Sequence, residues 1–305
     1  MAARTVLQQA VPTTFGLKAA NWLVGLLDAW TWLGRVRRDG LAVQLGGAAG
    51  TLAAYGSAGG LMLELFAREL GLAEPTLPWH TNRVRMAELG SALCAAAGAS
   101  GKIGRDVTLL AQTEVGEVAE RPLAGRGASS TMPHKRNPIG SVIAVACARS
   151  AVAAAGLLVA SPPHELERAA GAWHAEWGAL SDALLYAGGS AAAIREVLQG
   201  LVIFPERMRD NLDRAGGVVL AEQATFALAE RVGLTEARAI LARLSGRSIE
   251  GRSLRDELLA DAGVREVVSE EEIDALVDPH SALGAADALV GRALTRFAVE
   301  VGDAE

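Results

Sequence analysis

Apolar residues recur at intervals of three and four positions along most of the chain, which is the spacing that places them on one face of a helix. Within residues 17–38 this face consists of Leu23, Leu26, Leu27, Trp30 and Leu33, and Gly40 follows it. Similar stretches, separated by glycines and prolines, predict further helices. Their approximate ranges are 41–70, 81–112, 142–158, 164–188, 194–201, 208–212, 218–233, 237–244, 270–278 and 285–299. The pattern therefore predicts an all-α protein.

Residues 41–63 carry no charged side chain over a length that would suit a membrane span. The stretch contains six glycines and few large aliphatic residues. We interpret it as a helix buried on all sides within a large helical assembly, where small residues let neighbouring helices approach closely. We therefore expect no membrane partner.

The pattern changes after Gly216 and Gly217. Arginine and glutamate are interleaved from there on, as on exposed helices. Ser269 is followed by three glutamates, which indicates a helix N-cap with acidic residues in its first turn. We predict a central helical-bundle domain at 1–216 and a smaller C-terminal helical domain at 217–305.

Composition and charge bear on the fold class, on nucleic-acid binding and on localisation. Half of the 305 residues are apolar and only 4% are aromatic, which favours packed helices over sheets. The formal net charge of -6 disfavours nucleic acid as a partner, because phosphate binding needs a basic face. The N-terminal residues lack the apolar run of a signal peptide, so we expect a cytoplasmic protein.

The titratable residues show no metal-binding spacing. Cys94 and Cys147 lie in apolar helical contexts and are predicted to be buried free thiols in a reducing compartment. The five histidines are scattered, and neither an HExxH nor a CxxC pattern occurs. We therefore predict no metal and no cofactor.

The densest polar cluster lies between Gly127 and Pro138. Its glycines and prolines argue against a regular helix and predict a loop. Lys135 and Asn137 offer donors that suit a carboxylate or phosphate ligand. A serine in this positive field, such as Ser129, can act as a base toward a C–H group that a neighbouring carboxylate makes acidic. The alternative interpretation is a solvated, basic surface loop.

The loop sequence Ser-Ser-x-Met-Pro-x-Lys-x-Asn-Pro resembles the signature loop of the fumarase/aspartase superfamily, whose subunits are bundles of long helices. Residues 3–16 by themselves fit either an ordinary N-terminal coil or a polar site, and they resemble a second signature region, usually Gly-Arg-Thr-His-x-Gln followed by Pro-Thr-Thr. The resemblance implies that Ser129 is the catalytic base and that Lys135 and Asn137 hold a substrate carboxylate. It places further side chains at the substrate, namely those of Arg4, Thr5, Gln8, Ser130, Met132 and His134.

Residues 79–83 are similar to a family segment that lies near the active site. The resemblance adds His80 and Arg83 to the substrate-binding candidates. A hydrogen-bond cluster at the start of a helix, capped by Thr81 or Asn82, is an equally good interpretation of these residues. Just ahead of the signature loop, Glu114 and Glu117 are expected on one helix face in a supporting structural role.

Two valines indicate the branch of the superfamily. Many of its lyases pair a histidine at the place of Val6 with a glutamate at the place of Val142. Losing one partner would leave a buried group unsatisfied, whereas losing both leaves an apolar contact and suggests a different chemistry. The 3-carboxy-cis,cis-muconate cycloisomerases have this pattern, and the segment around Trp173, Glu176 and Trp177 is similar to theirs.

The resemblance implies a lactone-forming cycloisomerase that acts on a small tricarboxylate in the protocatechuate branch of the β-ketoadipate pathway. It also implies a homotetramer, because three subunits build each active site in the family. Family members have a further N-terminal helical region that this chain is expected to lack. The alternatives are an adenylosuccinate-type lyase, against which both valines count, and a catalytically silent, N-terminally truncated helical oligomer.

Overall fold

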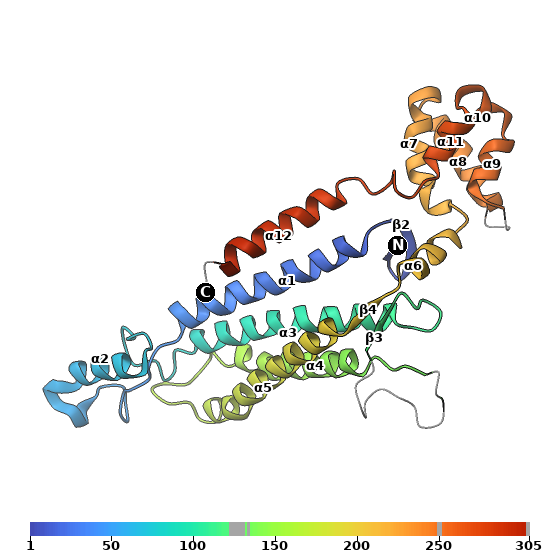
Figure 1. Cartoon of the computed structure of the whole chain (residues 1–305). Helices are drawn as coiled ribbons and strands as arrows, with labels where there is room; N and C mark the ends of the chain where they lie inside the picture. The colour runs from blue at the N-terminus through green and yellow to red at the C-terminus, as the bar shows by residue number, and fades with distance from the viewer. Residues whose placement is uncertain (122–131, 133–134, 249–251, 303–305) are drawn as a thin grey trace. The chain divides into compact units, whose positions relative to one another are not determined.

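The computed structural model describes residues 1–302, except for 122–131, 133–134 and 249–251. The described chain is predominantly helical, which confirms the predicted all-α class (Figure 1). Contacts divide it into two compact units. The hairpin unit comprises Met1–Leu23, Gln112–Glu117 and Ile203–Glu305, and the bundle unit comprises Val24–Ala111 and Val118–Val202. The boundary predicted from the sequence near Gly216 stays a prediction.

Three long helices form the main core of the bundle unit, namely α3 (Val84–Leu110), α4 (Ile139–Ala160) and α5 (Ala172–Gln199). Their shared core consists largely of alanine, including the fully buried Ala97, Ala151 and Ala183. A Cβ atom on Gly101 would lie 2.7 Å from the Cβ of Ala148. Small residues therefore allow α3 and α4 to pack closely.

By length and composition alone, helix α4 could cross a membrane, and 28% of the residues in its most apolar stretch are buried. Core helices of globular proteins share this length and composition, so these two properties are weak evidence for a membrane span. Ser190 on α5 donates a buried hydrogen bond of 2.9 Å to the carbonyl oxygen of Ala144, which holds α4 against α5.

The prediction of one buried helix over 41–70 is wrong. Residues 41–52 form a loop, a 3-10 helix (Ala53–Ala58) follows, and only α2 (Gly59–Leu70) is α-helical. Gly47 and Gly50 adopt positive φ angles of 66° and 82°, which interrupt a helix. Most residues of 47–58 are exposed, so the stretch is neither continuous nor buried on all sides.

The N-terminal residues form a β-hairpin that the helical pattern did not predict. Strand β1 (Ala2–Thr5) pairs antiparallel with β2 (Gln8–Pro12). The two residues of the turn, Val6 and Leu7, have positive φ angles of 51° and 65°. Two-residue hairpin turns favour this left-handed conformation because it matches the strand twist, although it is unusual for a β-branched residue.

The hairpin leads into α1 (Phe15–Arg35), and a π-helical turn (Val36–Gly40) follows it. The turn ends at Gly40, the residue at which the sequence predicted the end of the helix. Strands β3 (Val118–Glu120) and β4 (Leu201–Ile203) form a second two-stranded sheet. After β4 come α6 (Pro205–Asp213) and a short 3-10 helix (Val218–Leu220). The last helix of the described chain is α12 (Ala286–Gly302).

Five helices share a separate apolar core within the hairpin unit. They are α7 (Ala221–Val232), α8 (Leu234–Ser248), α9 (Leu254–Ala260), α10 (Ala262–Val267) and α11 (Glu270–Leu276). The core includes the buried side chains of Leu228, Leu244 and Ile273. Ser269 caps α11 in a reciprocal capping box with Glu272, which confirms the predicted N-cap.

Other local predictions were wrong for identifiable reasons. Helix α3 begins after Arg83 without a side-chain cap, so neither Thr81 nor Asn82 caps it. Residues 112–117 are not helical, and Gly116 has a φ of 61°. Helix α5 continues through the glycines at 188–189, where a Cβ atom on Gly189 would make only an ordinary contact of 3.6 Å with Cys147 Sγ.

Both cysteines are free but only partly buried, contrary to the predicted full burial. Partial burial raises the pKa of the Cys94 thiol, because the thiolate loses hydration.

Candidate functional site

The described end of the signature loop leads directly into α4. Lys135 is exposed, and its backbone N–H donates to the carbonyl oxygen of Met132 at 3.0 Å. Asn137 is half-buried, and its carbonyl oxygen accepts from Ile139 N–H at 2.9 Å. Ser129, Ser130 and His134 lie outside the described residues. The structure therefore places a cation and an amide within the last residues before the helix.

Glu120 lies at the other end of the same loop and binds the first turn of α4. Its Oε2 atom accepts from Gly140 N–H at 2.9 Å, and its Oε1 atom accepts from Ser141 N–H at 2.8 Å. The Ser141 hydroxyl also donates to Oε1 at 2.6 Å. No local sequence pattern points to Glu120, because its partners lie on a helix 20 residues away.

In the hairpin unit, Arg4 is bound by a buried carboxylate. Its guanidinium donates to Glu117 Oε2 at 3.0 Å and to Oε1 at 2.7 Å, and Glu117 is fully buried. Asn211 donates to the same Oε1 atom at 2.9 Å. This arrangement neutralises the buried charge and fixes β1 to residues 112–117. Glu117 thus has the structural role expected of it, whereas Glu114 is exposed.

Thr5 and Gln8 flank the tip of the hairpin. They are paired across the strands, and both are exposed. Between them Val6 is 95% exposed, so no part of the described hairpin unit covers it. In the bundle unit Val142 is 48% exposed. The apolar contact between the two valines stays a prediction.

A buried polar cluster occupies the start of α3. Arg83 is 6% exposed, and its Nε atom donates to Glu176 Oε1 at 3.1 Å while its Nη2 atom contacts Oε2. The Arg83 guanidinium also lies 4.8 Å from the ring centroid of Trp79. The His164 ring is buried beside it, with Nε2 3.4 Å from Glu176 Oε1. These contacts match the helix-start interpretation of Arg83, and a substrate contact stays a prediction.

His80 lies close to a second arginine that the sequence analysis missed. Arg168 Nη1 lies 3.2 Å from His80 Nδ1, and since arginine only donates, this nitrogen accepts. Arg168 also stacks on Trp173 at 5.4 Å and donates to the carbonyl oxygen of Gly47 at 2.8 Å. Burial, and then the charges of Arg168 and Arg83, lower the pKa of His80. A neutral imidazole is therefore favoured at neutral pH.

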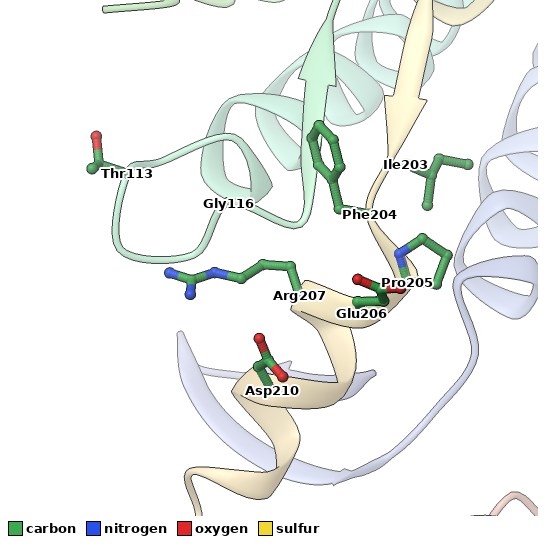
Figure 2. Close-up of a pocket in the computed structure, with 8 residues that line it drawn as sticks. All are labelled: Thr113, Gly116, Ile203, Phe204, Pro205, Glu206, Arg207 and Asp210. Atoms are coloured by element: carbon green, nitrogen blue, oxygen red, sulfur yellow. The ribbon is translucent and has the colours of Figure 1, made fainter. Parts of the chain in front are cut away.

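One cavity of about 720 Å³ lies in the hairpin unit, between the 113–116 turn and the start of α6 (Figure 2). Arg207 extends toward that turn and donates from Nε to the carbonyl oxygen of Val115 at 3.2 Å. None of the candidate site residues lines this cavity. Within the described part of the chain, no group of three or more histidine, cysteine, aspartate or glutamate residues could hold a metal ion.

Comparisons with known proteins agree with the helical architecture. A family model described as "Lyase" matches residues 1–152, and one described as "Adenylosuccinate lyase C-terminus" matches residues 217–293. A solved 3-carboxy-cis,cis-muconate lactonizing enzyme from Pseudomonas putida has a TM-score of 0.87 at 40% identity, over 97% of this chain and 66% of that one. A fumarate lyase from Mesorhizobium has a TM-score of 0.88 at 35% identity, with the same coverage.

Curated relatives are similar over nearly the whole chain. The 3-carboxy-cis,cis-muconate cycloisomerase of Bradyrhizobium diazoefficiens is 48% identical, and that of Pseudomonas aeruginosa is 45% identical, each over 96% of this chain. The nitrosuccinate lyase of Streptomyces davaonensis is 44% identical, also over 96% of this chain. The chain spans 65%, 64% and 64% of the lengths of these relatives, respectively.

Proposed function

Because the chain belongs to the fumarase/aspartase superfamily of lyases, we propose that its activity is that of a 3-carboxy-cis,cis-muconate cycloisomerase. The observation that carries the proposal is the 45–48% identity to two relatives of that name over 96% of this chain. The joint presence of Val6 and Val142, where many lyases of the superfamily carry a histidine and a glutamate, supports the same branch.

The proposed step uses groups that this chain carries in its signature loop. A substrate carboxylate adds across a conjugated double bond, negative charge develops on a second carboxylate, and a proton is then delivered to carbon. Lys135 and Asn137 would stabilise that doubly charged carboxylate, since donors aimed at developing charge lower the barrier. Ser129 would carry the proton. All atoms of the substrate stay in the lactone, so the proposed step consumes no cofactor.

The other candidates receive roles that fit their contacts. Thr5 and Gln8 are exposed at the hairpin tip and can reach a ligand, whereas Arg4 is bound by Glu117 and would chiefly hold that tip in place. Ser130, Met132 and His134 would line the substrate. His80 and Arg83 would contribute the donors that Arg168 and Glu176 leave free.

We also infer a homotetramer with shared active sites in the cytoplasm, acting in the β-ketoadipate pathway. Large apolar side chains are exposed along three long helices, and a second copy of the chain could cover them. On α4, α5 and α12 these include Val142, Ile143, Val152, Leu157, Trp177, Leu184, Leu185, Leu294, Phe297 and Val299.

A second candidate function is elimination from a succinyl-type substrate. It is favoured by the 44% identity to a nitrosuccinate lyase and by the adenylosuccinate lyase model that matches residues 217–293. A catalytically silent helical oligomer is the third candidate, since the chain spans 64–65% of the lengths of the cycloisomerase relatives.

A spectrophotometric assay would separate these three functions. Purified protein would be incubated with 3-carboxy-cis,cis-muconate, nitrosuccinate, adenylosuccinate and argininosuccinate in parallel. Loss of the conjugated-diene absorbance with the muconate alone is the expected result, and Ser129→Ala should abolish it without changing the circular dichroism spectrum. Turnover of a succinyl substrate instead would favour the second candidate, and no turnover would favour the silent oligomer.

A further inference from the structure

Helix α4 begins immediately after the candidate ligand groups but lacks a cap of its own. Its N-cap residue is Pro138, which offers no side-chain acceptor. The first N–H groups of a helix have no partner within the helix and need an external acceptor. At α4 that acceptor is Glu120, which comes from β3 on the other side of the signature loop.

The Glu120 carboxylate binds the second and third residues of this helix. Its two oxygens accept three hydrogen bonds from two consecutive residues, Gly140 and Ser141, and Ser141 is fully buried. A negative charge also interacts favourably with the positive end of the helix dipole. Because these amides are already bound, the start of α4 is not available to a carboxylate of the substrate.

The packing around Glu120 leaves little room for displacement. A Cβ atom on Gly140 would lie 2.6 Å from Cγ2 of Val197 on α5 and 3.1 Å from Glu120 Oε2. Arg121 N–H donates to the carbonyl oxygen of Gly200 at 3.0 Å, which holds the end of β3. A backbone hydrogen bond therefore holds the strand end beside Glu120, and close packing against Val197 confines Gly140.

We propose that Glu120 is a positioning residue, which fixes the start of α4 and thereby holds Lys135 and Asn137 where they bind the substrate carboxylate. Asn137 lies two residues before the first residue of α4, and its carbonyl oxygen accepts from Ile139. A displacement of the first turn therefore moves Asn137 directly. This inference rests on the proposed function, since it assigns Glu120 to the same ligand site.

The test compares Glu120→Gln with Glu114→Gln. Glutamine keeps the size of the side chain, but its NH₂ group cannot accept a hydrogen bond. It would face the backbone N–H of either Gly140 or Ser141, and the hydrogen bond from that N–H would be lost. Glu114 lies six positions earlier, in the hairpin unit, and is exposed, so the same substitution there provides a control for the change of charge. Ser141→Ala removes only the hydroxyl contact and should have a smaller effect in the same direction.

Amide hydrogen exchange measures the anchoring without reference to activity. In Glu120→Gln the peptides that cover 135–141 should exchange about tenfold faster, while those of α3 and α5 stay unchanged. The control should match the wild type throughout. Unchanged exchange over 135–141 in Glu120→Gln would overturn the anchoring role, whatever the enzyme does.

Kinetics measure the positioning. With the substrate that the wild type turns over, Glu120→Gln should lower kcat about 10–100-fold with KM changed less than about threefold, because small misplacements of binding groups cost about that much. In an Asn137→Ala background the same change should cost much less, because both act through one contact. If the losses in kcat from the two substitutions were additive, Glu120 would be an ordinary helix cap with no positioning role. The same conclusion would follow if Glu120→Gln left kcat unchanged while hydrogen exchange over 135–141 became faster.

The two proposals fail in different ways. If the wild type turns over none of the four assay substrates, the proposed function fails and no positioning role in it survives. The exchange measurement then still decides whether Glu120 anchors the start of α4.

Discussion

Two glutamates three positions apart hold the two signature regions, and they do so by different means. Glu117 is fully buried in the hairpin unit, where the Arg4 guanidinium and the Asn211 amide neutralise it. Glu120 is only partly buried in the bundle unit, where backbone amides of α4 and one hydroxyl bind it. The comparison indicates that loss of Glu117 leaves a cation without its partner, whereas loss of Glu120 leaves two uncharged backbone amides and one hydroxyl without their acceptor.

The largest expected effect follows from Glu117→Ala. Removing one member of a buried ion pair costs about 3–5 kcal/mol of folding free energy, because the remaining charge is left unpaired. Chemical denaturation should show this loss, and Glu114→Ala should stay within about 0.5 kcal/mol of the wild type. A loss of less than about 1 kcal/mol for Glu117→Ala would mean that Arg4 reaches water once its partner is gone.

Gly140→Ala should have the next largest effect. The added methyl group would meet Val197 Cγ2 at 2.6 Å, and overpacking of this kind costs about 1–3 kcal/mol. The midpoint of thermal unfolding should therefore fall. On the same helix, a Cβ atom at Gly156 would meet no neighbouring atom within 4 Å, so Gly156→Ala should raise the midpoint slightly. Equal midpoints for the two variants would contradict the close packing at the start of α4.

Glu120→Ala should destabilise the protein less than Glu117→Ala does. Loss of a helix cap costs about 0.5–2 kcal/mol, which is less than the cost of leaving a buried charge unpaired. The free energy of unfolding from urea titration would measure the difference between the two alanine variants. If Glu120→Ala cost as much as Glu117→Ala, the contrast between an ion pair and an amide-bound carboxylate would be wrong.

The smallest expected effect is the contribution of His80, in the bundle unit, to the pH dependence of stability. The pKa of His80 is lowered in the folded state by burial and by two arginines, so the unfolded chain binds its proton more readily. The stability contribution of neutral His80 is therefore present above about pH 6.5 and is lost as the pH falls below it. His80→Gln should flatten this part of the stability profile, and NMR titration of the His80 ring should give a midpoint below 6.5. A midpoint at or above 6.5 would contradict the assigned environment.

Several elements were predictable because their information is local. Helices α1, α4 and α12 follow from apolar spacing and from the glycines and prolines that bound them. The cap at Ser269 was predictable because all its partners lie within three residues. The signature loop and the superfamily were identified from consecutive residues, without knowledge of the fold.

Local patterns misled where packing or backbone geometry decided. Residues 41–58 are uncharged, which favoured a buried helix, yet positive φ angles at Gly47 and Gly50 break it. Conversely, α5 continues through Gly188 and Gly189, because the surrounding helix and its packing on α4 outweigh about 1 kcal/mol of lost propensity at each glycine.

The sequence by itself determined the helical class, the superfamily and the side chains that candidate chemistry requires. Only the tertiary structure decided which partners those side chains have: Arg4 with Glu117, Arg83 with Glu176, and Glu120 with the start of α4. The reason is physical. Helix propensity and capping act over a few residues, whereas a buried charge is stabilised by whichever donor the fold brings close, and these partners lie 113, 93 and 21 positions apart.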